Sequence, residues 1–153
     1  MKLTEKEKLL LKDLKTAEQL CIDKYNKYAK EASDKKLKEL FSGIEKVEKD
    51  HLNTIQNIMD GKTPTMKSSS KGNSSNKKPD YKASSNLSSK AKKKDAFLCQ
   101  DALTTEKQVA GTYNTSVFEF AQPKLRNVLN HIQKEEQQHG LKLYEYMNDN
   151  SMY

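Results

Sequence analysis

Two of the three histidines in this 153-residue chain stand three residues after a glutamate. Glu48 precedes His51 in "EKVEKDH", and Glu136 precedes His139 in "QKEEQQH". Residues three apart on an α-helix lie on the same face, so the carboxylate and the imidazole of each pair could bind one metal ion. The repeated Glu-x-x-His spacing therefore indicates a candidate metal site.

A further glutamate stands 30 residues before each pair, Glu18 in the first case and Glu106 in the second. Four carboxylates gathered in a protein core would repel one another and lose their hydration, whereas two divalent cations would balance their charge. One Glu from each of two helices and a Glu-x-x-His from each of the other two is the ligand set of di-iron and di-manganese bundles. We therefore expect two divalent ions, iron or manganese with zinc also accepted, bound by Glu18, Glu48, His51, Glu106, Glu136 and His139.

A single Glu-x-x-His is more often a hydrogen-bonded core pair than a metal site, because so short a motif recurs by chance. Two copies with equally spaced upstream glutamates favour metal, and a vestigial site that survives as a buried hydrogen-bond network is the alternative. Tyr25 and Tyr113, seven residues after the upstream glutamates, either pack in the core or contact the ligands. Glu31, Glu119 and His131 fall off the ligand face and are expected at the surface.

The two halves of the chain are copies of one unit. A shift of 88 residues without a gap places Tyr25 on Tyr113 and His51 on His139. The further matches are Asp13 on Asp101, Glu18 on Glu106, Asn26 on Asn114, Glu31 on Glu119, Leu37 on Leu125, Ile44 on Ile132, Glu48 on Glu136 and Met59 on Met147. Such a match indicates duplication of one structural unit.

Each unit has the pattern of a helical hairpin. Thr4 with Glu7 has the spacing of a capping box, Ser33-Asp34 can cap a second helix and Asp95 a third, and Pro123 suits the first position of a fourth. Apolar residues and candidate ligands recur every three or four positions, at 11, 14, 18, 21, 25, 28, 32; 37, 41, 44, 48, 51, 55, 58; 99, 102, 106, 110, 113, 117, 120; and 125, 129, 132, 136, 139, 143, 146. This periodicity predicts four helices in one bundle.

Residues 60–94 differ in composition from both units. They contain ten Lys, two Asp and nine Ser, a local balance of +8 in a chain whose net charge is +7. Because so polar a segment cannot bury enough apolar surface to fold, we expect a flexible linker between hairpins at 1–59 and 95–153. Its lysines could also bind nucleic acid or another polyanion, although Tyr81 is its only aromatic residue.

Cysteine content and the first residues limit the class of protein. Cys21 and Cys99 are too few for a disulfide framework, and we expect both as free residues of the core. The stretch "MKLTEKEKLLLKDLK" has only a three-residue apolar run between charges, unlike a signal peptide or a membrane span. We therefore expect synthesis in the cytoplasm.

With these motifs the chain resembles the ferritin-like superfamily over residues 4–59 and 95–148. The resemblance implies an all-α, ferritin-like four-helix bundle made of two duplicated hairpins, with the linker as the crossover between the second and third helices. It also implies that Tyr25 and Tyr113 match a tyrosine near the ligands of ferritins. The chemistry implied is that of oxygen or peroxide, in a peroxidase, catalase-like or ferroxidase-like reaction.

The second unit is also similar to the Coat F family of endospore-forming bacteria. This resemblance rests on Asp-x-Leu at 101–103, Glu-Lys at 106–107, Tyr-Asn at 113–114, Pro-x-Leu-Arg at 123–126, Glu-Glu-x-x-His at 135–139 and the final Met-Tyr. It departs at the ending "NDNSMY", where the family leads us to expect a Gly before the last two residues. The family is named for a spore coat protein, so the resemblance implies a spore location and contacts with a second copy or with other coat proteins.

Three functions follow as hypotheses. The first is a di-metal protein of the spore or its coat with redox chemistry. The second is a structural coat protein in which the Glu/His cluster is vestigial or purely structural, and the third is a polyanion binder acting through residues 60–94. Whether the chain is an enzyme is left open at this stage.

Overall fold

The computed structural model describes residues 1–66, 77–84 and 86–153. The described residues form four α-helices and no strand: α1 (Glu5–Glu31), α2 (Lys35–Met59), α3 (Ser89–Glu119) and α4 (Pro123–Asp149). The all-α fold predicted from the periodicity is therefore confirmed.

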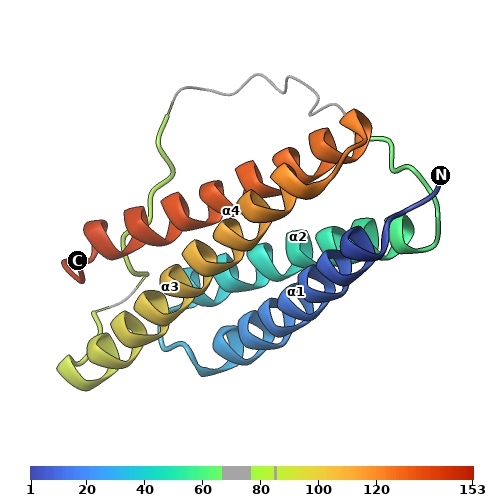
Figure 1. The fold of residues 1–153 in the computed structure, drawn as a ribbon. Coiled ribbons are helices and arrows are strands. Elements are labelled where there is room, and N and C mark those ends of the chain that lie inside the picture. Colours follow the sequence, from blue (N-terminus) through green and yellow to red (C-terminus); the bar gives the residue numbers. More distant parts are fainter. Residues whose placement is uncertain (67–76, 85) are drawn as a thin grey trace.

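Two helical hairpins, α1 with α2 and α3 with α4, pack into one bundle (Figure 1). Helices α1 and α3 run antiparallel, because Tyr25 contacts Glu106 while Tyr113 contacts Glu18. Helices α2 and α4 also run antiparallel, with Glu48 and His51 facing the Glu-x-x-His of α4. The long connection from α2 to α3 is the crossover that this arrangement requires.

The helix starts follow the capping signals, with one correction. Thr4 and Glu7 form the expected capping box, Asp34 caps α2 and Pro123 begins α4. Helix α3 begins at Ser89, however, so residues 89–94 are helical and do not belong to the linker. Its N-cap is Ser88, because a serine oxygen can accept from the first turn and the following Lys and Ala residues favour helix.

Asp95, expected as that cap, holds the turn between α1 and α2 instead. Its buried carboxylate accepts hydrogen bonds from the N–H of Ser33 at 2.8 Å and of Asp34 at 2.9 Å. The 88-residue shift places Glu7 at the equivalent position, and Glu7 accepts from the N–H of Ala121, in the turn between α3 and α4, at 3.2 Å. Each hairpin turn is thus fixed by an acid from the other hairpin.

Asp34 connects α2, α4 and the linker. It accepts a hydrogen bond from the Tyr146 hydroxyl at 2.9 Å, from the N–H of Leu37 at 3.3 Å, and from both the N–H and the hydroxyl of Ser84. Burial acts to raise the pKa of this carboxyl, but the bonds from Ser84 and Tyr146 outweigh burial and lower it. Asp34 is therefore a buried carboxylate held by hydrogen bonds.

Residues 77–84 of the linker lie against the same end of the bundle. Lys78 pairs with Asp149 at 2.9 Å, and the N–H of Ala83 donates to the side chain of Asn150 at 2.8 Å. The prediction of a flexible linker falls partly on residues 67–76 and 85, which lie outside the described residues. The described part after this gap is bonded to the C-terminal end of α4.

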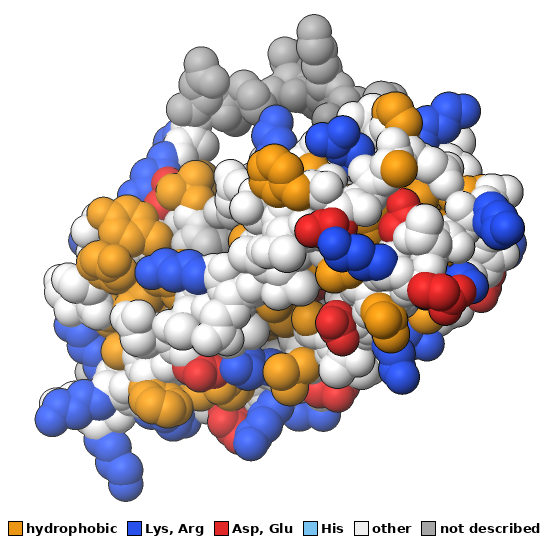
Figure 2. All heavy atoms as spheres, in the orientation of Figure 1, with side chains coloured by type: hydrophobic (Ala, Val, Ile, Leu, Met, Phe, Trp, Pro, Cys, Tyr) orange, Lys and Arg blue, Asp and Glu red, His pale blue; other side chains and the backbone are white. Residues whose placement is uncertain are grey.

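The predicted stripes form most of the core, and residues beside them such as Leu98, Leu103 and Val128 complete it. All their residues are buried except Tyr28 and Ala110, which are half-buried. The visible surface carries Lys and Arg mixed with Asp and Glu, and several hydrophobic side chains are exposed between them (Figure 2). None of the described helices is long and apolar enough to cross a membrane.

Candidate metal centre

The six candidate ligands lie together at the middle of the bundle, all buried in the core. They form two overlapping groups of possible ligands, and within each group the ligand atoms lie within 4.8 Å of one another. One group is Glu18, Glu48, His51 and Glu136; the other is Glu48, Glu106, Glu136 and His139. Sequence spacing left open which glutamates would bridge two ions, and the geometry favours Glu48 and Glu136, because only these belong to both groups.

Both histidines turn the same ring nitrogen toward the carboxylates. Nδ1 of His51 lies 3.1 Å from Glu48, 3.2 Å from Glu136 and 3.6 Å from Glu18. Nδ1 of His139 lies 3.2 Å from Glu48, 3.4 Å from Glu136 and 3.5 Å from Glu106. Each imidazole therefore presents one nitrogen to the oxygens with which it would share an ion.

Each of the six side chains keeps one buried polar atom that has no hydrogen-bond partner among the described residues. These atoms are Oε2 of Glu18, Oε1 of Glu48, Nε2 of His51, Oε2 of Glu106, Oε2 of Glu136 and Nδ1 of His139. An unsatisfied buried polar atom costs about 1–3 kcal/mol, more when it is charged. Oxygen and nitrogen donors gathered without partners are the set that a divalent transition metal binds.

The carboxyl groups of the cluster differ in the direction of their pKa shifts. Burial raises the pKa of Glu18 to about 9 and holds that of Glu106 well above its ordinary value. Burial also acts to raise the pKa of Glu48, but the nearby imidazoles of His139 and His51 lower it. Without metal, burial therefore favours the neutral form of Glu18 and Glu106, the terminal glutamates, and the neighbouring imidazoles favour the ionised form of Glu48.

The two histidines supply the matching positive charge. Burial acts to lower the pKa of His139, yet the carboxyl groups of Glu106, Glu136 and Glu48 raise it to about 11. The pKa of His51 is raised in the same way, by Glu135 first and then by Glu136. Burial acts to raise the pKa of Glu136 too, but Glu106, His139 and His51 lower it. Two protonated imidazoles would therefore balance ionised Glu48 and Glu136, as two divalent ions would balance four carboxylates.

Tyr25 and Tyr113 contact the terminal glutamates across the bundle. The hydroxyl of Tyr25 on α1 donates to Glu106 on α3 at 2.5 Å, and the hydroxyl of Tyr113 on α3 donates to Glu18 on α1. Burial raises the pKa of both hydroxyls well above the ordinary value. Both tyrosines therefore pack in the core and also contact the candidate ligands.

Replacing Tyr25 or Tyr113 by phenylalanine should weaken the bundle without emptying the site. Each change removes one buried hydrogen bond to a carboxyl, which we expect to cost about 1–3 kcal/mol of unfolding free energy. The measurements are chemical denaturation and metal content. Tyr28→Phe, which removes a bond from a half-buried hydroxyl to Asp101, is the matched control and should cost less. Loss of metal from the Tyr25→Phe or Tyr113→Phe protein would contradict this supporting role.

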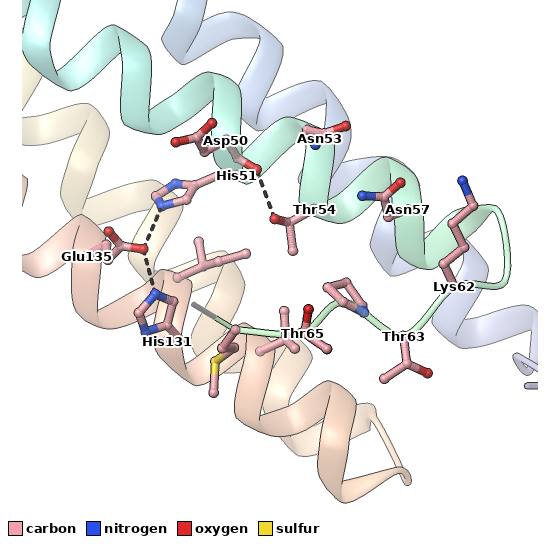
Figure 3. Close-up of a pocket in the computed structure, with 14 residues that line it drawn as sticks. Asp50, His51, Asn53, Thr54, Asn57, Lys62, Thr63, Thr65, His131 and Glu135 are labelled. Carbon is pink, nitrogen blue, oxygen red and sulfur yellow. Dashed lines mark hydrogen bonds and ion pairs between the residues drawn. The ribbon is translucent and has the colours of Figure 1, made fainter. Parts of the chain in front are cut away.

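A pocket of about 570 Å³ reaches the cluster between α2 and α4. Residues 62–66, which follow α2, form one wall, and His51, His131 and Glu135 lie at the inner end (Figure 3). The remaining lining is largely polar, with Asp50 among it. This pocket therefore gives access to His51 from between α2 and α4.

A second pocket, of about 350 Å³, opens between α3 and α4 above Glu106 and Glu136. The small residues Ala110 and Gly140 leave this space open. The 88-residue shift places Ile22 and Leu52 at the equivalent positions of the first hairpin. The two hairpins therefore differ in how they cover the cluster.

The sequence analysis missed Glu135 and its contacts with two histidines. His131 is partly exposed, as expected, but its Nε2 pairs with Glu135 at 2.8 Å, and Glu135 also lies 3.5 Å from Nε2 of His51. The sequence offered a signal only for the His131–Glu135 pair, because these residues are four apart on one helix. Glu31 and Glu119 are exposed, as predicted.

Cys21 and Cys99 are free and buried, as predicted. Burial raises the pKa of both thiols. Both are therefore small core residues in the thiol form.

The fold and the cluster define a four-helix bundle protein with a buried Glu/His site, an arrangement compatible with the ferritin-like superfamily. Residues 94–153 match the family model of the Coat F domain, which confirms the resemblance of the second hairpin to the Coat F family. The matched residues contain Glu106, Glu136 and His139. No curated protein and no solved structure matches the chain.

Proposed function

We propose that this chain is a di-metal protein of the bacterial spore coat, binding two iron or manganese ions at the centre of its bundle. Zinc would fit the same donors. When bound, iron or manganese would supply redox chemistry toward oxygen or peroxide, as a peroxidase, a catalase-like enzyme or a ferroxidase. The match to the Coat F domain supports the location, and the buried cluster supports the metal.

The observation that carries the proposal is the set of six buried donors, each with an atom that no described residue satisfies. A cluster kept only as a hydrogen-bond network would be expected to pair its own polar atoms, because unpaired ones destabilise the fold. The residues also fit the ions in number, charge and type. Four carboxylates and two imidazoles are the ligands of two-metal carboxylate bundles.

The roles of the residues follow from the two overlapping groups. Glu48 and Glu136 would contact both ions, while Glu18 with His51 and Glu106 with His139 would complete one ion each. Tyr25 and Tyr113 orient the two terminal glutamates through their hydroxyls. The surrounding aliphatic core buries the six side chains, and two pockets reach them.

The test is the metal content of the purified chain. Elemental analysis of protein prepared without added metal, and again after reconstitution with iron or manganese, should give about two ions per chain. Peroxide and oxygen consumption by the loaded protein would then distinguish the candidate reactions. A chain that holds no metal even after reconstitution would rule out the di-metal function.

The family match favours a structural coat protein as the second candidate. In that role the bundle would contribute surface contacts to a second copy or to other coat proteins, and the Glu/His cluster would be dispensable. Spores that contain only a form of this protein with all six candidate ligands replaced would then assemble a normal coat. The third hypothesis, nucleic-acid or polyanion contact through residues 60–94, gains no support from the comparisons.

A further inference from the structure

We infer that Glu135 is a positioning residue for His51 and makes the ion held by Glu18 and His51 the more tightly bound of the two. This inference rests on the proposed di-metal function. It concerns a residue outside the six ligands and predicts that the two halves of a duplicated site are unequal.

The first step is the geometry around His51. Nδ1 of the ring faces the ligand carboxylates, and Nε2 points the opposite way, 3.5 Å from Oε1 of Glu135. His131, one turn earlier on α4, contacts the same Glu135 oxygen at 2.8 Å (Figure 3). Glu135 therefore stands between the two imidazoles, and His131 fixes its position.

The second step is the form of histidine that a metal needs. An imidazole that binds an ion through Nδ1 must be neutral and carry its proton on Nε2. A carboxylate that accepts from this N–H fixes the tautomer and the ring orientation and makes the other nitrogen a better ligand. Glu135 is placed to do this for His51, whose Nε2 is buried and has no full hydrogen bond in the described chain.

The third step is that His139 lacks the same support. Every carboxylate within ion-pair distance of His139 in the described residues contacts Nδ1 and none contacts Nε2. The 88-residue shift explains the difference, because Val47 stands at the position equivalent to Glu135 and Gly43 at the position equivalent to His131. Duplication gave both hairpins the ligands, but only α4 carries the pair that supports a histidine of the other hairpin.

The experiment is a titration of the metal-free full chain with Co²⁺, followed by calorimetry and visible absorption. The unchanged protein should bind two ions with different affinities. Glu135→Gln keeps the size of the side chain and removes its charge. It should lower the affinity for the ion held by Glu18 and His51 by roughly 10- to 100-fold and leave the affinity for the other ion nearly unchanged. Val47→Glu places a carboxylate at the position equivalent to Glu135 under the 88-residue shift, and it should strengthen binding of the weaker ion.

Glu39→Gln, an exposed change on α2, is the matched control and should leave both affinities unchanged. The inference is wrong if Glu135→Gln leaves both affinities unchanged, or weakens both equally as a general structural defect would. Two ions bound in that case would leave the di-metal function standing. An unchanged chain that binds no Co²⁺ would instead overturn the proposed function and this inference with it.

Discussion

Replacing Glu48 and Glu136 together by alanine should remove both metal ions from the chain. Only these two ligands belong to both groups of donors, so their loss leaves each ion with one glutamate and one histidine. Glu18→Ala or Glu106→Ala should instead release one ion preferentially, because each of these residues belongs to one group. Elemental analysis of the purified variants measures this difference directly.

The same variants should differ in how metal stabilises them. An ion at 100 times its dissociation constant stabilises the folded state by about 2.7 kcal/mol, so two ions would raise the unfolding temperature by roughly 10–20 °C in a chain of this size. The double variant should show no such rise when iron or manganese is added. Thermal unfolding with and without metal is the measurement.

The chain offers a matched control in Glu31 and Glu119, which are also related by the 88-residue shift but are exposed. The Glu31→Ala/Glu119→Ala protein loses the same number of carboxylates and should keep both ions. A Glu48→Ala/Glu136→Ala protein that still held two ions would show that the metal lies elsewhere. An equal loss of metal from both double variants would point to a general effect of charge.

Helical periodicity and duplication were sufficient to predict the bundle and the burial of the six candidate ligands. Glu18 and Glu106 lie at stripe positions of α1 and α3, so their side chains had to enter the core once four helices packed together. The bridging pair could not be predicted, because both glutamates of each unit occupy the stripe equally well. The choice depends on how closely α2 and α4 place Glu48 and Glu136, which is a property of packing between helices.

Features that rest on contacts between the hairpins were also beyond the sequence. Asp95 has the residue type of an N-cap, and local rules cannot show that its carboxylate is bonded to Ser33 and Asp34 more than 60 positions away. Glu135 lies beside the stripe, so periodicity did not mark it as a candidate for the site. Its contact with His51 exists because the packing of α4 against α2 brings these two residues together.

Replacing Asp34 by alanine should destabilise the metal-free bundle by about 3 kcal/mol. The change removes the cap of α2 and leaves the buried hydroxyl of Tyr146 without its acceptor, and each loss costs about 1–2 kcal/mol. It also releases Ser84 and with it the last part of the linker. Urea unfolding of the two metal-free proteins at neutral pH gives the difference.

This loss should depend on pH with a definite sign. The hydrogen bonds hold the pKa of Asp34 below its ordinary value despite burial, so the ionised carboxylate stabilises the fold above the unfolded-state pKa. That contribution disappears as the pH falls through the folded-state pKa. The gap between the unchanged protein and Asp34→Ala should therefore be largest at neutral pH and shrink below about pH 4.

Asp23→Ala is the control, because Asp23 is exposed on α1 and accepts only from Gln19 in the described residues. It should change the unfolding free energy by less than about 0.5 kcal/mol at any pH. If Asp34→Ala cost no more than Asp23→Ala, the buried acid would not hold the end of the bundle. A gap that widened in acid would show that Asp34 is protonated in the native state, since a neutral carboxyl would stabilise the fold most where it stays neutral.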